Sequence, residues 1–192
     1  MQIRSLSFIL ACAFFIMACG GSQSLQTVDE GDIPSWYKNV PTDPNYLYAA
    51  NTATSQDLQV ALDKAGTGGR TEIGRQVEVK IEGLQKRFDQ EIGIGKDAEL
   101  LQQFTQASKN VVSTCLTGSK IKKQEYFQDG KFWRAYVLVE YPVGAANEAL
   151  MQQIKSTQQM QTRFQSSQTF KDLEDEVKKY EQWKASQPTS DK

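Results

Sequence analysis

The clearest periodic pattern in the chain lies between residues 58 and 88. Apolar or small side chains recur there at three- and four-residue spacing, which is typical of one face of an α-helix. They are Leu58, Ala61, Leu62, Ala65, Gly69, Ile73, Val77, Ile81, Leu84 and Phe88. Thr54, Ser55 and Asp57 precede this run and supply helix-start residues. The pattern predicts one long amphipathic helix that buries this face.

Three glycines, Gly66, Gly68 and Gly69, lie inside the predicted helix. Each destabilises a helix interior by about 1 kcal/mol relative to alanine. Two explanations stay open: the helix kinks here, or the small residues let it approach a neighbouring element closely. A phosphate-binding loop is disfavoured, because the run lacks the Lys-Ser/Thr ending of a P-loop and does not follow a strand. We therefore expect a packing role for the three glycines.

Two further segments add a helix and a strand. Residues 97–113 carry apolar side chains at helical spacing, among them Leu100 and Phe104. Residues 46–50 alternate large and small side chains, which predicts a short strand. Pro34-Ser35-Trp36-Tyr37 precedes that strand, and its aromatic pair indicates that the packed part of the chain begins there.

The strongest β signal is a hairpin formed by residues 121–128 and 131–141. These segments flank Asp129-Gly130, a residue pair preferred in two-residue hairpin turns. The expected cross-strand pairs are Glu125 with Arg134 and Ile121 with Leu138. We therefore predict an α+β fold, in which a small antiparallel sheet (the N-terminal strand plus the hairpin) is packed by two amphipathic helices.

The chain after Pro142 is helical but polar. Seven glutamines fall between Gln152 and Gln168, and Ser166-Ser167 can interrupt the helix. Leu173, Val177 and Tyr180 give the last helix only a thin apolar stripe, of the kind used by an exposed arm or a partner helix. We expect a Gln-rich helical arm over residues 143–184 and a disordered tail over residues 185–192.

The N-terminus has the features of an export signal. Arg4 is followed by an apolar run of about fourteen residues, whereas a membrane-spanning helix needs about twenty. The run ends in Ile16-Met17-Ala18-Cys19, which resembles the lipobox of bacterial lipoproteins. Cys12 fits the same pattern, but it would leave too short an apolar run before it. The alternative is an ordinary secretory signal with incidental cysteines.

The lipobox resemblance implies a lipid anchor at Cys19. The cysteine would receive a diacylglyceryl group on sulfur, residues 1–18 would be cleaved off as the signal peptide, and the new amine would be acylated. Acyl chains such as palmitate then hold the protein to a membrane stably. Gly20 after the cysteine favours the outer membrane by analogy with lipoprotein sorting, and we expect the protein to face the periplasm. Residues 19–33 are small, polar and acidic, and we expect a flexible tether with a reach of roughly 20 Å.

The amino-acid composition disfavours several classes of function. The chain has 22 Lys and Arg against 23 Asp and Glu, a balance that disfavours nucleic-acid binding. It contains no histidine, so the commonest general base and metal ligand is missing. After signal cleavage and acylation of Cys19, Cys115 is the single free thiol, and its apolar neighbours favour a core position over a nucleophile.

No other side-chain pattern points to catalysis. The carboxylates interleave with lysines as on a solvated helix face, and we expect no metal, no cofactor and no enzymatic activity. Catalysis without histidine would require carboxylate or thiol chemistry. Phe132 and Trp133 near the hairpin tip can form either a contact patch or part of the core.

The order of these features resembles a known family. The order is a lipobox, a short linker, P-x-W-Y, a strand, an Ala-rich helix containing Gly69-Arg70, a second helix, and a hairpin that ends Tyr136-Val137-Leu138-Val139. It resembles the twenty-kilodalton membrane-associated lipoprotein family of bacteria (LPP-twenty-like) over residues 34–142. The resemblance implies an α+β fold without catalytic residues. The chain departs from it in its glycines 66–69 and its C-terminal extension.

Two functions follow as expectations. The first is a lipid-anchored envelope lipoprotein that acts as a non-catalytic structural or interaction module and binds another envelope protein. The alternative is a binder of a small ligand or cell-wall glycan that uses aromatic side chains such as Trp133.

Overall fold

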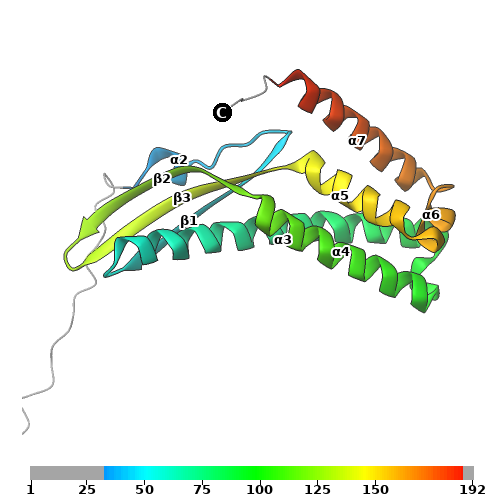
Figure 1. Cartoon of the computed structure of the whole chain (residues 1–192), viewed down its shortest axis with the longest axis horizontal. Helices are drawn as coiled ribbons and strands as arrows, with labels where there is room; N and C mark the ends of the chain where they lie inside the picture. Colours follow the sequence, from blue (N-terminus) through cyan, green and yellow to red (C-terminus); the bar gives the residue numbers. More distant parts are fainter. Residues whose placement is uncertain (1–32, 188–192) are drawn as a thin grey trace, which may run out of the picture. The chain divides into compact units, whose positions relative to one another are not determined.

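A computed structural model describes residues 33–187 of the chain. Its sheet has three antiparallel strands in the spatial order β1-β3-β2 (Figure 1). The strands are β1 (Tyr46–Ser55), β2 (Lys120–Asp129) and β3 (Phe132–Pro142). Residues 1–32, and with them Cys19, the signal and most of the predicted tether, lie outside the described part, as do residues 188–192.

The helices precede and follow these strands in the order α2 to α7. They are α2 (Ser35–Lys38), α3 (Leu58–Ile92), the 3₁₀ helix η2 (Ile94–Lys96), α4 (Ala98–Gly118), α5 (Val143–Ser156), α6 (Gln158–Phe164) and α7 (Gln168–Ser186). Side chains of Asp57, Asp97 and Ser167 cap α3, α4 and α7 by accepting backbone N–H groups. The fold is α+β, as predicted.

The central strand β3 is covered on both faces. Its Val137 and Val139 belong to the main core, which includes the buried stripe of α3. Its Tyr136 and Leu138 face the other way and pack with Trp36 of α2 in a smaller core. Figure 1 shows α3 running along the sheet and α2 near the strands. Trp36 is buried, which agrees with the packing role expected for the aromatic pair.

The glycines of α3 allow close packing on the sheet. The helix continues without a break from Leu58 to Ile92. A Cβ atom built on Gly69 would lie 2.5 Å from Cγ2 of Val139, and one on Gly68 would lie 2.7 Å from Oδ1 of Asn51. Of the two explanations that the sequence left open, close approach to a neighbouring element is the one the structure supports.

The hairpin forms, but the predicted register is wrong by two residues between the turn and Lys123. Asp129 pairs with Phe132, so the turn consists of Gly130 and Lys131 rather than Asp129 and Gly130. Glycine takes the first turn position because its φ is +59°, a conformation that other residues rarely adopt. The observed partners are Tyr136 for Glu125 and Val139 for Ile121. The shift is two residues at Glu125, which keeps that side chain on its predicted face. At Ile121 the bulge reduces the shift to one residue, which turns this side chain to the face covered by α3.

Three element boundaries also differ from the prediction. β1 continues to Ser55, so Asp57 rather than Thr54 or Ser55 caps the first long helix. The second helix continues five residues beyond Ser113 and includes Cys115 in its last turns. α7 ends at Ser186, which places the first two residues of the predicted disordered tail in a helix.

The predicted C-terminal arm is instead part of the domain. Helices α5, α6 and α7 contribute buried side chains to the same core as α3 and α4. They are Ala146, Leu150, Met151, Ile154, Met160, Phe164, Phe170, Leu173 and Val177. Phe164 stacks on Phe88 with ring centroids 4.4 Å apart. The expectation of an exposed arm is therefore wrong, because the chain turns twice and brings three thin apolar stripes onto one surface.

Candidate functional site

Strand β2 is an exposed edge of the sheet. The strand order leaves β1 and β2 at the two edges. All residues from Lys120 to Tyr126 are exposed, and of the last three only Phe127 and Asp129 are partly covered. An edge strand presents unpaired backbone N–H and C=O groups that can pair with another strand. β2 therefore has the geometry of a surface for strand addition.

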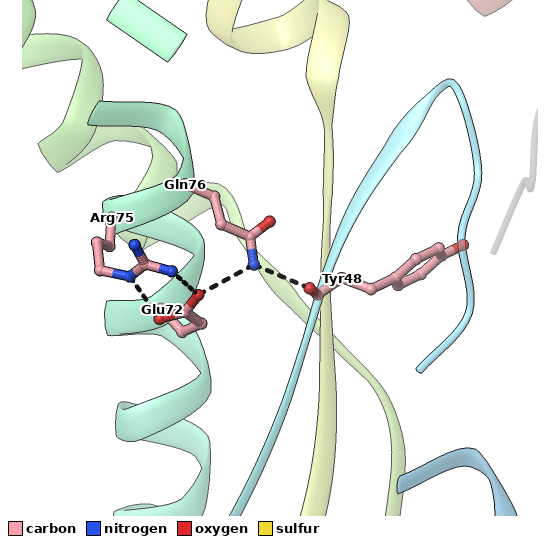
Figure 2. Close-up of polar contacts among 4 residues, drawn as sticks. All are labelled: Tyr48, Glu72, Arg75 and Gln76. Atoms are coloured by element: carbon pink, nitrogen blue, oxygen red, sulfur yellow. Dashed lines mark hydrogen bonds and ion pairs between the residues drawn. The ribbon is translucent and has the colours of Figure 1, made fainter. Parts of the chain in front are cut away.

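The opposite edge, β1, is tied to helix α3. Gln76 of α3 donates a hydrogen bond to the backbone carbonyl of Tyr48 at 3.1 Å and a second to Glu72 at 3.3 Å (Figure 2). Glu72 also accepts two hydrogen bonds from Arg75, at 2.8 and 2.6 Å. These bonds from Arg75 lower the pKa of Glu72 and keep it ionised. The Gln76 side chain of α3 thus occupies one backbone carbonyl of β1, that of Tyr48.

The first half of β2 is irregular and basic. A β-bulge interrupts the pairing with β3 between Ile121 and Lys123. Lys122 donates to Glu140 at 2.8 Å and to the Tyr48 hydroxyl at 2.9 Å, and these bonds raise the pKa of Lys122. Its ammonium also lies 4.8 Å from the centroid of the Tyr48 ring. Bulges and lysines are devices that protect an edge strand from indiscriminate pairing.

The second half of β2 is regular and open, and we call residues 123–129 the β2 edge surface. Lys123, Glu125 and Asp129 pair with residues of β3 in an unbroken register. The Glu125 carboxylate accepts a hydrogen bond from Nε1 of Trp36 at 2.5 Å, which fixes it on the face covered by α2. Tyr126 is 48% exposed on the opposite face.

The aromatic residues at the hairpin tip divide between the two roles that the sequence left open. Phe132 is 48% exposed beside the turn. Trp133 is partly buried against the main core, and its ring lies 6.0 Å from that of Tyr126 in an edge contact. Phe132 and Tyr126 therefore add apolar area to the exposed hairpin, while Trp133 supports it from beneath.

Trp133 does not line any of the three grooves described for residues 33–187. A groove of about 370 Å³ between α3 and α4 has Ile81, Val112 and Leu116 in its wall. A smaller one of about 290 Å³ lies beside α7 and includes Tyr180. The pocket expected for a glycan around Trp133 is not among these three.

Cys115 is fully buried in the main core, as predicted for a core thiol. Burial raises the pKa of its thiol, and a hydrogen bond with Tyr141 opposes this increase. The thiolate, which is the reactive form, is therefore disfavoured at this position.

Metal binding and membrane spanning are two further possibilities for residues 33–187. Within this part of the chain, no three Cys, Asp or Glu side chains gather as they would around a metal ion. None of the helices described is both long and apolar enough to cross a bilayer.

The sequence predicted the hairpin but not the exposed edge. Strand order depends on how β1 pairs with β3, and no local pattern specifies this. The cluster of lysines at positions 120, 122 and 123 is the signal that could have indicated an edge strand.

Compared with models of known protein families, with curated proteins and with solved structures, the chain matches none of them.

Proposed function

We propose that this chain is a lipid-anchored lipoprotein of the bacterial envelope that acts as a non-catalytic interaction module. The observation that supports the interaction role is the β2 edge surface, which is regular and exposed, contains exposed Tyr126 and lies beside exposed Phe132. Edge strands are a common means of binding a partner, since main-chain hydrogen bonds supply affinity and alternate side chains supply specificity.

The proposal of membrane attachment is supported by the sequence before the domain. A signal-like segment ends in Ile16-Met17-Ala18-Cys19, and a short polar segment connects Cys19 to the domain. Acyl chains on Cys19 would attach the domain to the outer membrane, in the manner of the twenty-kilodalton lipoproteins that the chain resembles. In this role the folded part serves as a contact surface held near the bilayer.

Both parts of the proposal are tested by comparing cells that produce the wild-type chain or Cys19→Ser. The cells are fed labelled palmitate and then treated with a lysine-reactive crosslinker. We expect palmitate on the wild type, none on Cys19→Ser, and wild-type chain recovered in crosslinked species from the membrane fraction. Equal labelling of the two chains would contradict the anchor, and recovery of the monomer alone across conditions would contradict the interaction role.

A further inference from the structure

We propose that the strand added to the β2 edge surface is β2 of a second copy of this chain. The inference rests on the proposed interaction role of that edge. The two strands would run antiparallel about a two-fold axis at Tyr126 and join two three-stranded sheets into one of six strands. Such a contact is isologous, because the same surface serves both partners.

The charges of β2 favour this antiparallel register. The regular part of the strand, Lys123–Asp129, begins with a cation and ends with an anion, so an antiparallel copy is complementary to it. The pairs would be Lys123 with Asp129, Gln124 with Gln128, Glu125 with Phe127, and Tyr126 with its own counterpart. Opposite charges directly across a strand pair stabilise it. Seven residues on each strand take part, and the bulge lies outside the ladder.

Other registers are less favourable. A parallel arrangement places Lys123 opposite Lys123 and Asp129 opposite Asp129. An antiparallel arrangement centred on Glu125 places two carboxylates together, and one centred on Phe127 places Glu125 opposite Asp129. Centres closer to Lys123 bring the bulge between Ile121 and Lys123 into the ladder. Like charges directly opposite each other destabilise a strand pair.

The groups beside these pairs are already held in place by the fold. Arg134 lies 3.4 Å from Asp129 in an ion pair, and Lys123 of the second copy would add a second cation to the same carboxylate. Trp36 holds Glu125 on the face that α2 covers. Tyr126 already rests against Trp133, so its exposed side is the part that a second Tyr126 would cover.

The position of Ile33, the first residue that the structure describes, agrees with this arrangement. Lys123 and Asp129 lie on the same face of the sheet as Leu138, which packs with Trp36 and Ile33. Residues opposite each other across a strand pair share a face, so the two-fold axis stands perpendicular to the joined sheet. Both copies of Ile33 would then lie on one face. Both segments leading back to Cys19 would start from that face, as attachment to one membrane requires.

The same geometry closes the assembly at two copies. A two-fold contact closes at two copies because each chain uses the same edge, β2, for it. At the other edge of the described sheet, Gln76 of α3 occupies the carbonyl of Tyr48 in β1. The sheet would therefore stop at six strands rather than extend into a filament.

Charge reversal in the full-length lipidated chain tests the proposal. The oligomeric state is measured in detergent by sedimentation for the wild type, Lys123→Glu, Asp129→Lys and the double variant. We expect a dimer for the wild type, about a tenfold weaker dimer for each single variant, and recovery to within about threefold in the double variant. The control is Lys86→Glu, an exposed lysine on α3, which should leave the dimer unchanged.

A wild-type chain that is monomeric at all concentrations would overturn the inference, as would a double variant no stronger than the singles. A single engineered cysteine gives a second measurement of register: Tyr126→Cys should form a disulfide with its own copy, and Glu125→Cys should not. Efficient self-linking at position 125 would overturn the register. If the wild type is monomeric but is captured in cells with a different protein, the dimer fails and the interaction role stands. If it is monomeric and captures nothing, both fail.

Discussion

Replacing Phe164 with alanine is expected to lower the free energy of unfolding by about 3–5 kcal/mol. Phe164 is fully buried, stacks on Phe88 at 4.4 Å and contacts Phe104 edge-on at 5.9 Å. Truncation removes this aromatic contact and leaves a cavity between α3, α4 and α6. Since domains are typically stable by about 5–15 kcal/mol, the loss would be a large part of the total.

The measurement is urea unfolding of the full chain, followed by circular dichroism and tryptophan fluorescence. The control is Arg163→Ala, an exposed neighbour in the same helix, which should change the stability by no more than about 0.5 kcal/mol. The two probes should give one coincident transition, because the C-terminal helices share the core of the domain. A loss below about 1 kcal/mol for Phe164→Ala, or two separate transitions, would show that α5–α7 form a peripheral arm after all.

Replacing Gly69 with alanine is expected to destabilise the domain by about 1–3 kcal/mol. Alanine is ordinarily the better helix former by about 1 kcal/mol, so the expected sign is the reverse of the propensity. The reason is the distance of 2.5 Å between the new Cβ and Cγ2 of Val139, in a helix packed closely on the sheet. The main core would have to separate locally to admit one methyl group.

Gly83 offers a matched control on the same helix. A Cβ at Gly83 meets no atom within 4 Å, so Gly83→Ala should stabilise the domain by up to about 1 kcal/mol. Adding Val139→Ala to Gly69→Ala removes the methyl group in conflict and should recover part of the loss. Thermal unfolding of the four chains distinguishes the two effects. If Gly69→Ala raised the stability as Gly83→Ala does, close packing of α3 on the sheet would not be the role of this glycine.

Local patterns were enough to predict the elements of the fold. The apolar stripe from Leu58 to Phe88 specifies α3 because a helix repeats its face at that spacing. The turn glycine at position 130 specifies a hairpin because only a few residues adopt its backbone conformation. These signals are contained in short windows of sequence, and the α+β class follows from their order.

Contacts between distant segments were not predictable in the same way. The hairpin register depends on where the two-residue turn falls, at Gly130 and Lys131, and the bulge before Lys123 then changes the partner of Ile121. The thin apolar stripe of α7 predicts an exposed helix, because the pattern of one helix does not show what packs on it. Its partners are on α5, which ends twelve residues before α7 begins and is separated from it by α6.

The candidate surface could be predicted only in part. Lysines are typical of a protected edge strand, and the sequence of β2 contains three of them: Lys120, Lys122 and Lys123. That β2 rather than β3 is the edge is a property of the sheet order. The bulge confines the irregular pairing to the start of β2, so the strand is regular from Lys123 onward.

The most direct test of the β2 edge surface is photo-crosslinking in cells from position 126. A photoreactive phenylalanine analogue replaces Tyr126 in the full-length chain, and the control places it at Val79, which is 55% exposed on α3. Both variants carry the intact lipobox at Cys19. We expect light-dependent adducts from position 126, with a second copy of the chain as the captured protein, and few from position 79. The absence of adducts from position 126, or equal yields at the two positions, would contradict the assignment of β2 as the contact surface.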